Sequence, residues 1–219
     1  MKPAKRTRQR TEGPRLTRDD WLDAAFAAVV EGGFDKLRVL MIAKALRVTR
    51  GSFYWHFADH AELQAALLER WRERQNLIDA ELRPHAGVDA QADLEHVLEA
   101  ALAHVGPDLE HMRFELALRG LGRRDANVAT LLAEVDAMRL SLFEAKFERL
   151  TGDPKTASEL ALLFYLAVVG CYQALARPGN PPQVKDYLKR LITQYLVVQQ
   201  APVKIARPAV LAKKPSRRR

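Results

Sequence analysis

The sequence predicts an all-α protein with about nine helices, and three observations support this. Apolar residues recur at three- and four-residue spacing in successive segments, as on one face of a helix. Clusters of Gly and Pro separate these segments, and no convincing apolar–polar alternation indicates a strand. With 219 residues, 48% of them hydrophobic, the chain is long enough to bury a core in two domains.

Capping patterns predict where the first helices begin. Thr17 is followed three residues later by Asp20, and Asp59 by Glu62, which is the spacing of a capping box. Thr49 is expected to cap a short helix between them. The first four helices are expected at residues 17–32, 39–46, 49–55 and 59–82.

The second half of the chain is predicted to contain five more helices, separated by Gly- and Pro-containing breaks. They are expected at residues 89–104, 108–121, 127–150, 155–176 and 181–199. The longest charge-free apolar stretch, residues 160–176, contains Gly170 and Gln173 and is marginal in length for crossing a bilayer. A buried helix is therefore expected there, and no membrane partner.

The net charge of +8 is unevenly distributed along the chain. Residues 1–18 carry seven Lys/Arg and one Glu, and residues 200–219 carry seven Lys/Arg and no acid, which leaves residues 19–199 at −5. A basic balance favours a polyanionic partner such as nucleic acid. We expect a basic flexible arm (1–16), a helix-turn-helix domain (17–64), a helical domain for ligand binding and dimerisation (65–199) and a basic disordered tail (200–219).

Three short helices followed by a long one are typical of a helix-turn-helix unit, whose second helix lies in the major groove of DNA. The candidate recognition segment is residues 49–57. Phe53 and Phe57, four residues apart, should pack inward, and Tyr54 and His56 should then point outward as phosphate donors. The candidate DNA-binding residues are Arg47, Thr49, Arg50, Gly51, Ser52, Tyr54, Trp55, His56 and His60.

The run Val48-Thr49-Arg50-Gly51-Ser52-Phe53-Tyr54-Trp55-His56-Phe57, with Leu22 to Val30, Gly33-Phe34, Ile42-Ala43 and Leu63, resembles the DNA-binding domain of TetR-type bacterial transcriptional regulators. The resemblance covers about residues 17–70. It implies a homodimer, a palindromic operator in double-stranded DNA, and a pocket for a small hydrophobic effector among the C-terminal helices. It also implies that the matching positions from Thr49 to His56 contact DNA.

Two residues depart from the family's pattern. Arg47 stands in the turn, where the family usually has glycine, and a non-glycine residue with positive φ is uncommon. His60 begins the fourth helix, where the family often has lysine, and its charge depends on pH. Both are kept as candidate phosphate contacts.

The resemblance also directs attention to the C-terminal helices. The last two long helices are expected to pair with their copies as a four-helix dimer interface, and the helices before them to enclose the pocket. Candidate pocket residues are Trp71, Met112, Phe114, Met138 and Phe143. Candidate interface residues are Leu160, Phe164, Ala167, Cys171, Leu188, Leu191 and Tyr195.

The sequence gives little support for metal binding, a cofactor or catalysis. Four histidines between residues 85 and 111 lack the spacing of a metal site, so no metal and no cofactor is expected. No nucleophile motif or phosphate-binding glycine loop is present, which argues against an enzyme. One cysteine and no visible secretory signal favour a cytoplasmic, nucleoid-associated location. The alternatives are a DNA-coating protein that uses its basic tails without ligand control, and an enzyme housed in the helical pocket.

Overall fold

The computed structural model describes residues 16–83, 89–103, 109–175 and 190, and all regular structure in these ranges is helical. The helices are α1 (Arg18–Gly32), α2 (Val39–Ala45), α3 (Arg50–Phe53), α4 (His60–Leu82), α5 (Ala90–Ala103), α6 (Leu109–Gly122), α7 (Ala126–Thr151) and α8 (Pro154–Leu175), with a 3-10 turn η1 (Phe34–Lys36). The all-α prediction is confirmed, with bounds that differ by one or two residues. The ninth expected helix, at 181–199, and both basic tails lie outside the described residues.

All three predicted N-cap residues stand at helix starts, and two of them, Thr17 and Asp59, make side-chain capping hydrogen bonds. Thr17 and Asp20 form a complete capping box, and Gly33 ends α1 with a φ of 76°. At α4, Asp59 accepts from the Glu62 backbone, but the Glu62 carboxylate accepts from the Ala58 amide, so this box is shifted by one residue. Thr49 is the N-cap of α3, although its side chain makes no capping hydrogen bond.

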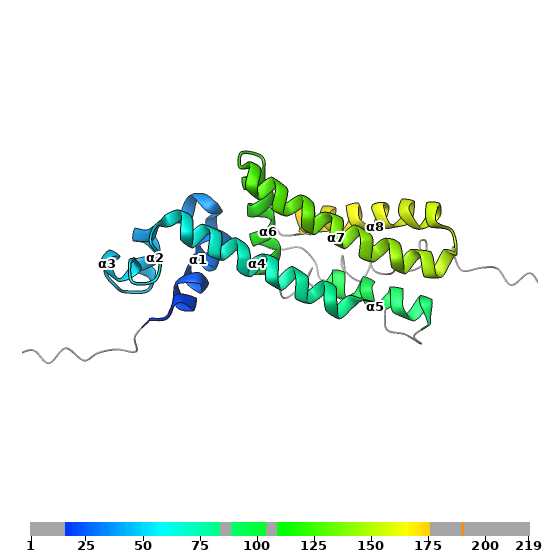
Figure 1. Ribbon diagram of the computed structural model, residues 1–219, viewed down its shortest axis with the longest axis horizontal. Coiled ribbons are helices and arrows are strands. Elements are labelled where there is room, and N and C mark those ends of the chain that lie inside the picture. The colour runs from blue at the N-terminus through cyan, green and yellow to red at the C-terminus, as the bar shows by residue number, and fades with distance from the viewer. Residues whose placement is uncertain (1–15, 84–88, 104–108, 176–189, 191–219) are drawn as a thin grey trace, which may run out of the picture.

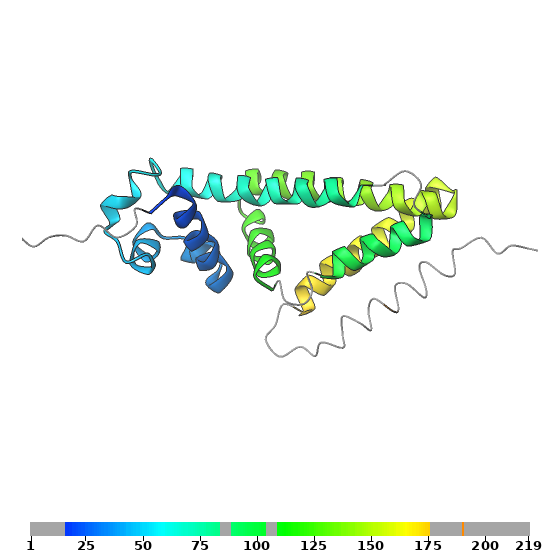
Figure 2. The ribbon, with the colours of Figure 1, turned by 90° about the horizontal axis from the view of Figure 1, so that it is seen from below.

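The molecule is elongated, with α1 to α3 at one end (Figure 1). Helix α4 leaves this end and runs beside α7, while α5 and α8 lie obliquely to them and α6 crosses between, so that α4 to α8 outline a triangle (Figure 2). Among the described residues, no helix is both long and apolar enough to cross a membrane.

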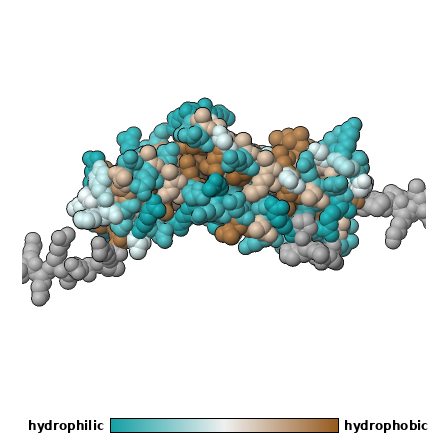
Figure 3. Space-filling view, in the orientation of Figure 1, coloured by the Kyte–Doolittle hydropathy of each residue, from teal (hydrophilic) through white to brown (hydrophobic). Residues whose placement is uncertain are grey.

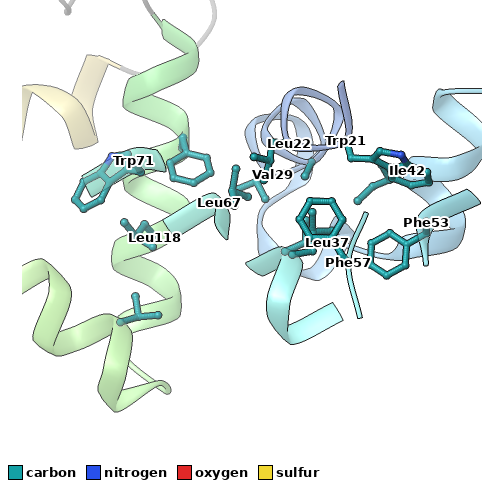
Figure 4. Close-up of a cluster of buried hydrophobic side chains, with 14 of the residues drawn as sticks. Trp21, Leu22, Val29, Leu37, Ile42, Phe53, Phe57, Leu67, Trp71 and Leu118 are labelled. Carbon is teal, nitrogen blue, oxygen red and sulfur yellow. The ribbon is translucent and has the colours of Figure 1, made fainter. Parts of the chain in front are cut away.

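Two hydrophobic clusters form the core. One joins α1 to α4 with α6 and the beginning of α7, and Figure 4 shows Trp21, Phe53 and Phe57 at one end of it and Trp71 and Leu118 at the other. The second cluster lies among α4, α5, α7 and α8 and contains Phe143, Phe147 and Phe164. Because α4 is unbroken from His60 to Leu82, the boundary expected at residue 64 falls inside a continuous helix.

Candidate nucleic-acid interface

The two residues predicted to face inward from the recognition segment are buried as expected. Phe53 and Phe57 are 0% and 2% exposed, and their rings stack at 5.5 Å. Trp21 of α1 meets Phe53 edge-on at 5.4 Å. These aromatic contacts hold α3 against α1, so its other side is fixed outward.

The outward side of α3 carries polar and aromatic groups. Thr49, Arg50 and Gly51 are exposed, and Tyr54 and Trp55 are 51% and 82% exposed. The Arg50 guanidinium donates to the Tyr54 hydroxyl at 2.9 Å and lies 5.8 Å from the centre of its ring. Such a surface offers a cation, hydroxyls and an aromatic edge to the bases and phosphates of a DNA groove.

The two histidines predicted to contact phosphates already make contacts within the domain. His56 is half-buried beside Trp21, at 6.3 Å between ring centres, so it does not simply point outward. The His60 Nε2 lies 2.5 Å from the carbonyl oxygen of Leu37, which fixes that ring nitrogen as a donor within the domain. Only the other nitrogen of His60 remains for a phosphate.

Arg47 adopts the turn conformation that the family's glycine provides. Its φ is 57°, and it is the only non-glycine residue with positive φ in the part of the chain that the structure describes. The following amides still close the turn, because the Val48 amide donates to the Ala43 carbonyl at 2.9 Å. The turn is thus preserved, and the Arg47 side chain is exposed.

Contacts at the start of α4 tie this unit to the long helix. The Arg18 guanidinium pairs with Glu62 at 3.0 Å and lies 4.6 Å from the centre of the Phe57 ring. Arg70 pairs with Asp23 of α1 at 2.6 Å. The helix-turn-helix unit is therefore attached to α4 through ion pairs from α1.

A cavity of about 80 Å³, here called the inner cavity, lies farther along α4. Three of the candidate pocket residues, Trp71, Met112 and Met138, line it. Seven polar residues that were not among the candidates also line it: Arg74, Gln75, Asp79, His111, Glu115, Arg139 and Tyr165. A second cavity of about 480 Å³ lies where α1, α4 and α6 meet, and Phe114 lines that one instead. Phe143 lines neither of these two, because it packs edge-on against Phe164 at 4.7 Å.

A buried polar network borders the inner cavity. The Arg139 guanidinium donates to both oxygens of Glu115 at 2.9 Å and to the Gln75 side chain of α4 at 2.8 Å. Arg119 donates to Glu115, to Asp136 at 2.8 Å and to the Tyr165 hydroxyl at 3.1 Å. This network connects α4, α6, α7 and α8 around one carboxylate.

The network shifts the ionisation of its members. Burial works to raise the pKa of Glu115, but hydrogen bonds and charges from Arg139 and Arg119 outweigh it and hold this pKa below its ordinary value. Burial, together with its contact with Asp136, raises the pKa of Tyr165 to about 12. Glu115 is therefore an anion and Tyr165 a neutral hydroxyl at neutral pH.

The predicted dimer residues on α8 need correction. Leu160 and Phe164 are 8% and 0% exposed because they pack into the second core cluster, so they offer no surface to another subunit. The outer side of α8 instead presents Leu162, Leu163 and Leu166, which are 49%, 55% and 57% exposed. Hydrophobic surface gathers over this helix (Figure 3). Ala167 is half-buried, and Leu188, Leu191, Tyr195 and the Cys171 side chain lie outside the description.

The arrangement of α1 to α3 and the exposed side of α3 are those of a helix-turn-helix unit. Residues 22–67 match the family described as bacterial regulatory proteins, tetR family, so this part of the chain is similar to that family's members. The regulators TtgR and, as a probable regulator, ArpR of Pseudomonas putida are each 38% identical over 66 residues, which is 30% of this chain and 31% of each relative. The match thus spans under a third of their length.

Solved structures share the fold over most of the chain. A transcriptional regulator from Rhodococcus sp. Rha1 has a TM-score of 0.70 at 19% identity, covering 86% of this chain and 99% of that one. A TetR-like regulator from Rhodococcus sp. RHA1 has a TM-score of 0.65 at 22% identity, covering 84% and 98%. A candidate regulator from Saccharomonospora viridis, in complex with choline, has a TM-score of 0.67 at 17% identity, covering 81% and 95%.

Proposed function

We propose that this protein is a homodimeric transcriptional regulator that represses from a palindromic operator and releases it when a small, largely apolar effector binds. The observation that carries the proposal is the continuity of α4, whose first turn holds the helix-turn-helix unit and whose last turns line the inner cavity. At 1.5 Å rise per residue, the 23-residue helix spans roughly 33 Å. Binding in the cavity would then favour one orientation of α3 over another.

DNA selection tests the first half of this proposal. The full-length protein is mixed with a random DNA pool, and the bound sequences are determined. A short palindrome whose half-sites lie about one helical turn apart supports a dimeric regulator. Long protected stretches without sequence preference would instead identify a DNA-coating protein.

The outer side of α8 is our candidate dimer surface. Leu162, Leu163 and Leu166 fall at helical spacing, and large exposed apolar side chains gathered on one helix are typical of an interaction site. The double change Leu163→Glu with Leu166→Glu should give a monomer in analytical ultracentrifugation. Leu77→Glu is the matched control, because Leu77 is as exposed on α4. A dimer that survives the double change contradicts this assignment.

The inner cavity supports ligand control more than passive coating. Eight apolar and seven polar residues line it, and a cavity that combines apolar surface with converging polar groups is typical of a small-molecule site. The structure from Saccharomonospora viridis that shares this fold is in complex with choline, which supports a small-molecule effector for this protein. Met112→Trp and Met138→Trp would fill the cavity, and the resulting protein should hold its operator in the presence of an effector that releases the wild type.

A further inference from the structure

Asp79 differs from the other buried carboxylates in the described part of the chain. Asp93 is occupied on both oxygens by Lys146 and Arg149, and Glu115 on both oxygens by arginines. Asp79 is 6% exposed, and its Oδ2 accepts from Arg83 at 2.9 Å. Its Oδ1 is buried and has no hydrogen-bond partner.

An unpartnered carboxylate oxygen is costly inside a protein. Leaving a buried acceptor unsatisfied costs about 1–3 kcal/mol, and more for a charged group. Asp79 lies in the wall of the inner cavity, beside Ile78 and Leu82 and one turn beyond Gln75. The Gln75 oxygen accepts from Arg139, and the Gln75 amide NH₂ does not donate to Asp79 Oδ1. A molecule in the cavity can supply it.

We infer that the effector site in the inner cavity recognises an apolar molecule bearing a hydrogen-bond donor, a hydroxyl or an amine, which binds Asp79 Oδ1. This inference rests on the proposed effector role of the cavity and narrows its ligand class. Arg83 holds Oδ2, so the free oxygen has a defined position. A ligand carboxylate would meet a like charge there and should be rejected.

The site also explains how such a ligand would act on α4. Asp79 lies in the last two turns of this helix, whereas Met112, Met138 and Tyr165 of the same cavity belong to α6, α7 and α8. A donor bound to Asp79 with its apolar part against the other helices would connect α4 to them. The contact therefore lies on the helix that carries the helix-turn-helix unit.

The test compares four small probes on the full-length protein by calorimetry and thermal shift: 2-phenylethanol, 2-phenylethylamine, phenylacetate and ethylbenzene. The alcohol and the amine should bind at least about tenfold more tightly than the hydrocarbon and the carboxylate, as expected for a hydrogen bond to a charged group. Equal binding of the four, absence of binding by all four, or a preference for phenylacetate overturns the inference.

The variant Asp79→Asn makes the test specific. Its amide oxygen would face Arg83 and its NH₂ would replace Oδ1, so the site would change from acceptor to donor with little change in shape. The preference should then shift toward phenylacetate, while the alcohol and amine lose about tenfold. The matched control is Asp93→Asn, a buried carboxylate outside the cavity, which should leave the preference unchanged.

DNA binding is measured separately on the selected operator. If the alcohol binds through Asp79 but the operator stays bound, the contact with Asp79 is supported and effector-driven release is contradicted. If Asp79→Asn keeps the wild-type preference while DNA binding is normal, the contact is overturned and the regulatory proposal stands.

Discussion

Within residues 17–64 the buried side chains are apolar or aromatic, whereas the helices beyond residue 65 bury charged and polar groups. The described buried polar side chains are Gln75, Asp79, Asp93, Glu115 and Lys146. Apolar packing needs no partner of defined charge, so the helix-turn-helix unit keeps its shape across conditions. A buried charge is stable only while its hydrogen-bond and ion-pair partners are in place, so we expect pH and ligands to affect the stability of the helical body more than that of the helix-turn-helix unit.

The largest effect on the helix-turn-helix side is expected from Phe53→Ala. Phe53 is 0% exposed and contacts Trp21, Tyr54 and Phe57. Its truncation should lower the free energy of unfolding by about 3–5 kcal/mol. Urea denaturation at neutral and mildly acidic pH should give the same loss. A loss that changes strongly with pH would contradict an apolar origin for the stability of this unit.

A loss of similar size but different origin is expected from Asp93→Ala in the body. The change leaves the ammonium of Lys146, 1% exposed and now 2.6 Å from Asp93, without its counter-charge. Breaking a buried pair in this way costs about 3–5 kcal/mol. The double variant Asp93→Leu with Lys146→Met should recover most of it, since the buried ammonium is removed together with its partner, and Arg149, which also pairs with Asp93, is 32% exposed. A double variant as unstable as the single one would show that packing, not charge, dominates here.

The effect of pH on the stability of the helical body should be traced through Glu115. Because its folded pKa lies below the ordinary value of 4.5, Glu115 stabilises the fold fully above that pH, and the contribution is lost as pH falls through the folded pKa. Glu115→Gln should cost about 1–3 kcal/mol at neutral pH. Denaturation curves of the two proteins should then converge on acidification. A constant difference down to acid pH would exclude this carboxylate as the cause.

Arg50→Ala should weaken operator binding by about 1–3 kcal/mol if Arg50 contacts a guanine, with little change in stability. In the free protein Arg50 donates to Tyr54, an exposed contact whose loss is minor. Tyr54→Phe is the companion variant, because it frees Arg50 while keeping the ring. Fluorescence anisotropy on the selected operator measures both, and unchanged binding by Arg50→Ala would remove it from the interface.

The smallest effect is expected from Arg47→Gly. A left-handed conformation costs a non-glycine residue about 1–2 kcal/mol, and part of this is offset by the greater freedom of glycine in the unfolded chain. The variant should be more stable by roughly 0.5–1 kcal/mol in urea denaturation. If Arg47 also contacts a phosphate, DNA affinity should fall and become less sensitive to salt. Lower stability would contradict strain at this turn.

The sequence was informative where local chemistry determines structure. The capping box at Thr17, the inward pair Phe53 and Phe57, and the helix order follow from spacing, and the structure confirms them. Helical periodicity identifies an apolar face, but it does not show whether that face packs in the core, lines a cavity or contacts another subunit. For that reason Leu160 and Phe164 were expected at a dimer surface and Phe143 at a cavity, although all three are core residues.

The sequence does contain a pattern that indicates the polar wall of the cavity. Leu67 and Trp71 continue at four-residue spacing into Gln75 and Asp79, so polar side chains replace apolar ones on the buried stripe of α4. A buried stripe that turns polar marks a place where hydrogen-bond partners must come from elsewhere. The partners themselves, Arg139 and Arg83, could not be assigned without three-dimensional contacts.

Because α4 is unbroken, a small tilt at one end of the helix becomes a larger displacement at its other end. From Asp79 to His60 the helix extends about 28 Å at 1.5 Å per residue. A rigid tilt of about 5° pivoting near Asp79 would move the start of the helix by about 2.5 Å along that lever arm. Hydrogen bonds to base edges tolerate only a few tenths of an ångström. On the function proposed above, a small shift at the cavity end of α4 would misalign the other end by several times the tolerance of base contacts.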